Sequence, residues 1–174
     1  ISLIKNTMVK IAPEFTKKRM LDDYLERYYM KLWPRNKYLT ANDFEKAKAI
    51  ASWKKTMKDE WDNIEVLNYN FERPHENVYH SGHDYHAEIA LDIKKIPKDN
   101  VGVEFVFTHL NKQGEYEFVD SQEFKLVSSK NGKCLYRANL VPEKAGTFFY
   151  GIRIYPRHKD LPHKQDFYLL RWID

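Results

Sequence analysis

Apolar residues in the first third of the chain recur at the period of an α-helix. Four of them are spaced by four positions: Met20, Tyr24, Tyr28 and Leu32. Thr16, just before this series, is a residue type that caps the first turn of a helix. The residue before a proline avoids the helical region, so Trp33-Pro34 is expected to end this helix. A shorter amphipathic piece is predicted over residues 3–9.

A second and longer helix is predicted behind Thr40, which stands three residues before Asp43 in a pattern close to a capping box. Its apolar positions are spaced by three or four: Phe44, Ala47, Ile50, Trp53, Met57, Trp61 and Ile64. Neither glycine nor proline interrupts this stretch. The pattern therefore indicates one long amphipathic helix.

Near Glu65 the hydrophobic period changes to two, which is typical of strands. Along one run, Val101, Val103, Phe105 and Phe107 would share one face of a sheet. After an extended stretch that begins at residue 66, strand-like runs follow at short intervals: 85–93, 101–110, 116–127, 135–140, 147–155 and 167–173.

Turn signals at 97–100, 111–114 and 131–132 separate these runs, and no helical pattern lies between them. This spacing predicts an antiparallel, immunoglobulin-like β-sandwich over residues 66–174. The fold class is then α+β, with a helical segment over residues 1–65.

Three tryptophans on the helices, Trp33, Trp53 and Trp61, would be poorly covered if the helices packed only on one another. We therefore expect the helices to pack partly on the β-domain and partly on a larger domain outside these residues. A chain that begins with Ile1 also favours a piece cut from something longer.

Composition excludes several classes of protein. Hydrophobic residues make up 43% of the 174 residues and charged residues 31%, which is ordinary globular composition. No apolar run is long enough for a membrane helix, and no signal peptide is visible. Cys134 cannot form a disulfide within the chain, is expected to be buried, and fits a cytoplasmic location. The net charge of +4 is too dilute to favour nucleic acid.

The histidines His75, His80, His83 and His86 form the most conspicuous polar cluster. Imidazoles are common zinc or nickel ligands, but the cluster has no cysteine nearby and its spacing does not match a strand. We interpret it as a solvated loop and assign no metal ligand.

The sequence contains no recognisable catalytic motif. Adjacent acids such as Asp22 and Asp23 point in different directions on a helix and do not share a site. The glycines are scattered, without a phosphate-binding loop, and no Ser/His/Asp arrangement can be nominated. We assign no catalytic and no cofactor-binding residue.

Aromatic residues make up 15% of the chain, and sugar-binding sheets use such rings to stack on the apolar faces of glucose. The candidates for glucan contact are Tyr79, Tyr85, Tyr116 and Tyr155. The alternative is that these rings build the core of the β-domain.

Three stretches together resemble the closing region of the α-glucan phosphorylases, glycosyltransferase family 35. Residues 12–29, with Phe15-Thr16 and Arg19, are similar to a late helix of the catalytic region. Residues 47–61 and 146–172 resemble the next helix and the final β-segment in the bacterial branch of that family.

The resemblance implies a two-lobed parent enzyme of the glycosyltransferase B type, whose late helices these would be. Such an enzyme transfers glucosyl units between α-1,4-glucan ends and phosphate in glycogen or starch metabolism, using pyridoxal phosphate. No position matches the cofactor-lysine motif, so the cofactor and the activity are expected in the missing upstream lobes and this piece is expected to be inactive. The direction of the parent's reaction, phosphorylase or synthase, is left open.

Within that parent, the β-domain would stabilise the enzyme or contact glucan. An independent carbohydrate-binding module and a protein-interaction β-sandwich are the alternatives.

Overall fold

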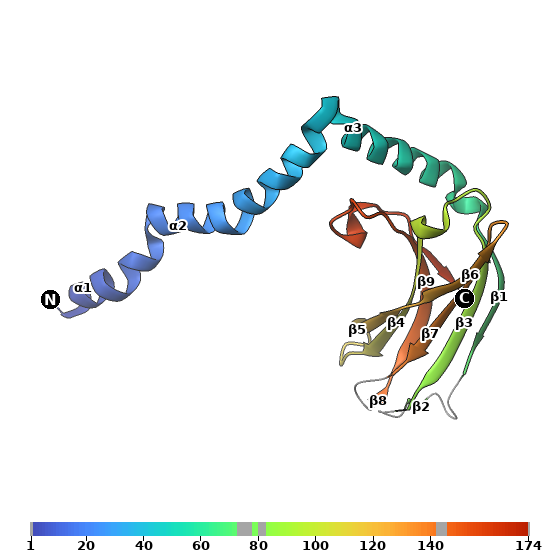
Figure 1. Ribbon diagram of the computed structural model, residues 1–174. Helices are drawn as coiled ribbons and strands as arrows, with labels where there is room; N and C mark the ends of the chain where they lie inside the picture. Colours follow the sequence, from blue (N-terminus) through green and yellow to red (C-terminus); the bar gives the residue numbers. More distant parts are fainter. Residues whose placement is uncertain (1, 73–77, 80–82, 142–145, 174) are drawn as a thin grey trace. The chain divides into compact units, whose positions relative to one another are not determined.

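The computed structural model describes residues 2–72, 78–79, 83–141 and 146–173 (Figure 1). The chain divides into two compact units, Ile1–Ser52 and Trp53–Asp174. The first unit is helical, and the second contains the end of the long helix and all of the strands. This arrangement confirms the α+β class.

The helical unit consists of short helical segments that follow one another along the chain. Thr16 is confirmed as an N-cap, because its hydroxyl accepts a hydrogen bond of 3.2 Å from the backbone N–H of Arg19. The segments are α1 (Ser2–Asn6), η1 (Thr7–Ile11), η2 (Ala12–Phe15), α2 (Lys17–Tyr24), η3 (Leu25–Tyr29) and the beginning of α3 (Met30–Glu60).

The predicted helix end at Trp33-Pro34 is wrong, because Pro34 lies inside α3. Pro34 is the fifth residue of α3, so its missing N–H removes only the first i→i−4 bond of that helix. The helical path instead breaks at Ala41, where ψ is 152°, and at the three residues that follow, which have positive φ. The N-cap predicted at Thr40 is also wrong, since its hydroxyl donates to the carbonyl of Asn36.

Two four-stranded antiparallel sheets form the second unit, with strand orders β1-β3-β7-β6 and β10-β9-β4-β5 (Figure 1). β2 and β8 form a separate two-stranded pair. The strands are β1 (Glu65–Phe71), β2 (Val78–Tyr79), β3 (Tyr85–Asp92), β4 (Val101–Leu110), β5 (Tyr116–Glu123), β6 (Lys125–Lys130), β7 (Lys133–Leu140), β8 (Gly146–Thr147), β9 (Phe149–Pro156) and β10 (Arg171–Ile173).

Most of these strands lie close to the runs predicted from the hydrophobic period. For β4, both predicted ends agree with the structure. The run predicted at 116–127 is wrong as a single strand, because β5 and β6 belong to different sheets. The chain crosses between the sheets at Phe124, which is buried and whose N–H donates to the carbonyl of Val103. The run predicted at 167–173 is a strand only in its last three residues.

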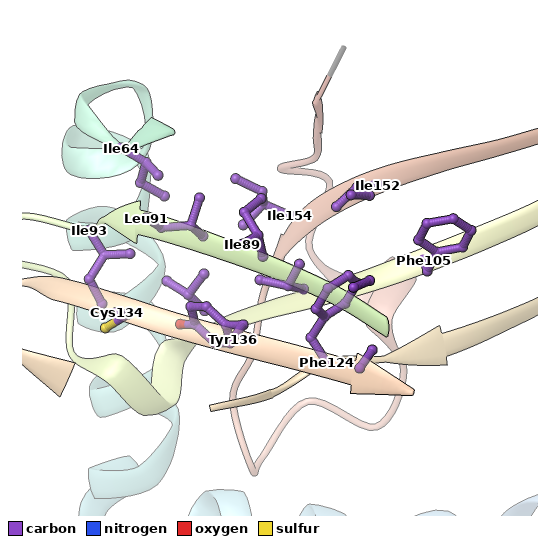
Figure 2. Packing of buried hydrophobic residues seen from close by; sticks show 14 of the residues in the cluster. Ile64, Ile89, Leu91, Ile93, Phe105, Phe124, Cys134, Tyr136, Ile152 and Ile154 are labelled. Atoms are coloured by element: carbon purple, nitrogen blue, oxygen red, sulfur yellow. The ribbon is translucent and has the colours of Figure 1, made fainter. Parts of the chain in front are cut away.

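One hydrophobic core lies between the inner faces of the two sheets. Figure 2 shows Ile89 of β3 next to Ile154 of β9, and Leu91 and Ile152 of the same strands belong to this core. The predicted inner face of β4 is confirmed, because its four alternating side chains belong to this core. Met57 in the last turns of α3 contributes to the same core, as do Trp61 and Ile64 in and just after the 3₁₀ turn that follows.

The segment between β9 and β10 packs on the last turns of α3. The Trp53 ring lies 5.3 Å from the ring of Phe167 and 4.6 Å from that of His158, measured between centroids. Lys54 donates from Nζ to the carbonyl of Asp166. Trp53 and Trp61 therefore pack with the sheets, as expected for part of the helical surface, while Trp33 is 61% exposed.

Candidate functional site

The four nominated tyrosines do not lie together. Tyr85 is buried in the core on β3, and Tyr155 is buried on the outer face of the other sheet. Tyr79 lies in β2, where its backbone pairs with that of Gly146. Tyr116, at the start of β5, is 65% exposed. Of the candidate tyrosines, it is the one that lines an open pocket among the described residues.

That pocket, of about 540 Å³, lies where the edge of one sheet meets the outer face of the other. Its aromatic walls come from strands far apart in the sequence. The lining rings are Tyr69 and Phe71 of β1, Tyr116 of β5, Phe149 and Tyr150 of β9, and Trp172 of β10.

A second pocket, of about 520 Å³, shares Tyr69, Trp172 and Ile173 with the first. It extends along β1 and β10, each of which is an edge strand of its sheet. Asn68 and Arg171 line it and supply polar groups. We call the two adjoining pockets the aromatic groove.

Local sequence sets the positions of the rings in the groove. A β-carbon at Gly151 would lie 3.0 Å from the Trp172 ring, so the glycine lets the indole approach β9 closely. Arg153, opposite Trp172 in the ladder, lies 5.6 Å from the indole centroid. The Tyr116 and Phe149 rings meet edge to face at 5.3 Å.

Sequence analysis missed Tyr69, Phe149 and Trp172 as members of this site. The signal that was available is the period of two: Phe149 alternates with Tyr150 and Ile152, which face the core. Nothing in the sequence indicated that β1 and β10 meet, because they lie about 100 residues apart.

A charged cluster covers another part of the same outer face. Glu104 on β4 is only 1% exposed and is held by Arg153 at 2.5 Å and by Lys164 at 2.7 Å. Lys164 also lies 3.0 Å from Glu123, which accepts a hydrogen bond from the hydroxyl of Tyr155. Each buried charge in the cluster has an opposite partner, as burial requires.

The cluster shifts the ionisation of its members. Burial and the Glu123 carboxylate raise the pKa of Tyr155 to about 12. Burial would raise the pKa of Glu123, but the Tyr155 hydroxyl and the Lys164 ammonium outweigh it, and this pKa is lowered. Burial likewise favours the neutral amine of Lys164, yet Glu104 and Glu123 raise its pKa overall. These pKa shifts all favour the ion-paired forms of the side chains. They are typical of a structural network of ion pairs, and not of a catalytic acid or base whose pKa lies near neutral pH.

The histidine cluster is only partly described, since His75 and His80 lie outside the described residues. His83 and His86 are exposed. His86 Nδ1 lies 3.1 Å from the side-chain oxygen of Asn139, and the His83 ring lies against Tyr85. Within the described ranges, no group of three or more histidine, cysteine or carboxylate side chains is placed to hold a metal ion.

Cys134 is buried, as expected, and lies 3.3 Å from the Ser129 hydroxyl. A buried thiol in a sheet behaves as a small apolar side chain.

The helical unit has a different surface, because no residue described between 2 and 52 is buried. Many of its large apolar side chains are exposed, among them Leu3 at 81%, Phe15 at 79% and Trp33 at 61%. A hollow of about 580 Å³ on this unit is lined by Leu25, Tyr29, Met30, Leu32, Trp33 and Asn36. We call these lining residues the helical hollow.

The chain thus combines a two-sheet β-unit, which carries a charged cluster on one outer face, with a helical unit whose apolar side chains are exposed. Residues 61–174 match the family described as glycogen phosphorylase C-terminal domain, and the chain belongs to this family.

The maltodextrin phosphorylase of Thermococcus litoralis is 26% identical over 176 residues, which cover 99% of this chain. The chain spans about a fifth of that enzyme's length, since the match covers 20% of it. No solved structure matches the chain. None of the helices in the described part combines the length and hydropathy that a membrane-spanning segment needs.

The charged cluster of the β-unit does not suit the pyridoxal phosphate that the family implies. A lysine that forms a Schiff base is activated by a lowered pKa. Lys164, the lysine of the charged cluster, instead has a raised pKa because two carboxylates hold its ammonium.

Proposed function

We propose that this chain is a non-catalytic closing region of an α-glucan phosphorylase-like glycosyltransferase, attached to its upstream lobes through the helical unit. The observation that carries the proposal is the apolar surface of that unit, where no described residue is buried. Exposed apolar area of this extent is typical of a surface that packs against another part of a protein.

The rest of the parent enzyme is the occupant that fits this surface. The chain aligns with about a fifth of a maltodextrin phosphorylase, so the remaining four fifths of such an enzyme would supply the packing partner. The helical hollow, with its two large rings and its aliphatic walls, would receive side chains from the upstream lobes. In this arrangement the β-unit stabilises the end of the enzyme.

The parent would be a pyridoxal-phosphate enzyme of the bacterial branch, acting in the cytoplasm on α-1,4-glucans in glycogen or starch metabolism. The helical unit would be the tail of its glycosyltransferase B-type lobe, and the β-unit an immunoglobulin-like sandwich. The family match and the maltodextrin phosphorylase relative support the substrate class. The cofactor and the catalytic groups would belong to the upstream lobes.

The proposal is tested by expressing the upstream lobes and this 174-residue chain as separate polypeptides. We expect each to lack full phosphorolytic activity toward maltodextrin, and the mixture to form a complex with increased activity. In this chain, Trp33→Ala and Tyr29→Ala together should weaken the complex at least about 10-fold, as for interface anchors. Lys31→Ala, on the same helix and outside the helical hollow, should leave it unchanged.

Phosphorolysis of a glucan by the 174 residues alone would contradict the proposal. So would an upstream coding sequence that lacks a pyridoxal-phosphate lysine motif.

A further inference from the structure

We propose that the aromatic groove of the β-unit binds a linear α-1,4-glucan chain. This inference rests on the proposed function for its choice of sugar. It goes beyond that function by assigning a ligand site to the β-unit.

Four rings around the groove keep part of their surface open to solvent. The exposed fractions are 39% for Tyr69, 65% for Tyr116, 42% for Phe149 and 48% for Trp172. Burying such rings fully would stabilise the fold, so four half-open rings around one hollow indicate a surface kept for a ligand. A glucose ring has an apolar face that stacks on an aromatic ring and a hydroxyl edge that needs polar partners.

Polar partners stand beside the rings. Thr108 lines the first pocket, and Asn68 and Arg171 line the second. Arg171 donates to the carbonyl of Ile64 at 2.6 Å, and this bond fixes the plane of a guanidinium that carries five N–H donors. Hydroxyl groups of a sugar are suitable acceptors for such donors.

The charge of the groove favours a neutral ligand. Among the described residues that line it, Arg171 alone carries a formal charge. A polyanion such as nucleic acid would need several basic side chains along its path. A neutral polyhydroxyl chain needs rings and hydrogen-bonding groups, which the groove has.

The shape favours a chain over a single sugar. Two pockets of about 540 and 520 Å³ adjoin along β1 and β10 and share Tyr69 and Trp172 as a common wall. Each volume falls within the range of small-ligand sites. A ligand that passes both pockets would contact rings from both sheets, as consecutive units of a linear glucan would.

The test is a titration of the 174-residue chain with maltoheptaose. Binding is measured by calorimetry and by the NMR shift of the Trp172 indole N–H resonance. We expect saturable binding at millimolar or lower concentration and a shift of that resonance, which a Trp172→Phe variant identifies. Tyr116→Ala should weaken binding about 3- to 10-fold, since an aromatic contact contributes about 0.5–1.5 kcal/mol. Trp172→Ala should weaken it at least as much.

Tyr168→Ala is the matched control, because Tyr168 is 70% exposed and lines neither pocket. It should bind maltoheptaose like the unmodified chain. Tyr116 is mostly exposed, so Tyr116→Ala should have the same thermal unfolding midpoint as the unmodified chain. The Tyr116→Ala variant therefore tests the inference even if Trp172→Ala does not fold. Cellohexaose, with β-1,4 linkages, should bind more weakly.

The inference is overturned if maltoheptaose does not saturate the chain, or if Tyr116→Ala binds as well as Tyr168→Ala. It is also overturned if the upstream lobes cover the Trp172 indole in the complex. The proposed function can survive each of these results, because complex formation through the helical hollow is measured separately.

Discussion

At the scale of single residues, a buried glutamate organises the outer face of the second sheet. Glu104 is almost completely buried, although it lies on the face of β4 that alternation assigns to solvent. The segment that carries Lys164 covers it and supplies a cation, while Arg153 on the neighbouring strand supplies another. The carboxylate is tolerated because both of its oxygens are paired.

Removing the Lys164 ammonium should destabilise the β-unit. We expect Lys164→Met to lower the free energy of unfolding by about 1–2 kcal/mol, a modest value because the lysine is partly exposed and Arg153 still holds Glu104. Chemical denaturation of the two proteins measures the difference. Lys159→Met, on the same segment, serves as the control and should change stability by less than about 0.5 kcal/mol.

The same cluster predicts a pH dependence with two limits. The lowered pKa of Glu123 adds stability above its usual value of 4.5, and this contribution is lost as the pH falls through the lowered value. The pKa of Tyr155, raised from 10.0 to about 12, adds stability that is complete below pH 10 and is lost as the pH rises toward 12.

Thermal unfolding midpoints of the unmodified chain and of Glu123→Gln, measured from pH 3 to pH 11, test this dependence. The difference between them should shrink below pH 4.5 and stay constant between pH 6 and pH 9. A difference that grows in acid would contradict the assignment.

A glycine provides the space for the Tyr155 ring. Gly102 lies opposite Tyr155 in the ladder, and a methyl group at this position would overlap the ring. Gly102→Ala should therefore destabilise the β-unit by about 1–3 kcal/mol, as overpacking does. Gly114→Ala is a useful contrast, because nothing lies within 4 Å and only its φ of +81° opposes a side chain.

At the scale of elements, the last turns of α3 act as part of the β-unit. Trp53 contacts the segment between β9 and β10, and Met57 and Trp61 lie in the core between the sheets. The 3₁₀ turn η4 (Trp61–Asn63) then leads directly into β1. One short stretch of chain thus connects the helix to the sheet edge without a linker.

Truncating the indole that contacts this segment should loosen it. We expect Trp53→Ala to lower the free energy of unfolding by about 2–4 kcal/mol, since it removes a partly buried ring that packs on Phe167 and His158. Hydrogen exchange should show the largest loss of protection between residues 158 and 168. Trp33→Ala, at an exposed position of the helical unit, should leave this segment unchanged.

At the scale of the whole molecule, the two units differ in how they satisfy their apolar side chains. The β-unit buries its inner faces in one core, whereas the helical unit leaves its large apolar residues exposed. Stability is therefore expected to reside in residues 53–174.

Two truncations test this distribution. A chain that begins at Trp53 should unfold within about 3 °C of the 174-residue chain, because it keeps the complete core. A chain that begins at Val66 loses Met57, Trp61 and Ile64 from that core and should be destabilised by more than about 5 kcal/mol. Equal unfolding midpoints for the two would contradict the role given to the end of α3. The domain boundary predicted after residue 65 stays a prediction about the parent enzyme.

Periodicity in the sequence was sufficient to separate helices from strands and to select the inner face of β4, although it misplaced several element ends. The change from a period of about 3.6 to a period of two near Glu65 marks the beginning of β1, and alternation along β4 selects its inner face. Both features follow from local geometry. Side chains return to the same face about every 3.6 residues in a helix and every two residues in a strand. The motif resemblance gave the family, which the match over residues 61–174 confirms.

Only the tertiary structure decided which strands meet and which faces are covered. Tyr155 is buried because the segment that carries Lys164 folds back over its sheet face, while Phe149, six residues earlier on the same face, stays half open. The aromatic groove depends on β1 and β10 meeting across about 100 residues of sequence. Such contacts depend on how the two sheets stack. The hydrophobic period of a single strand therefore does not predict them.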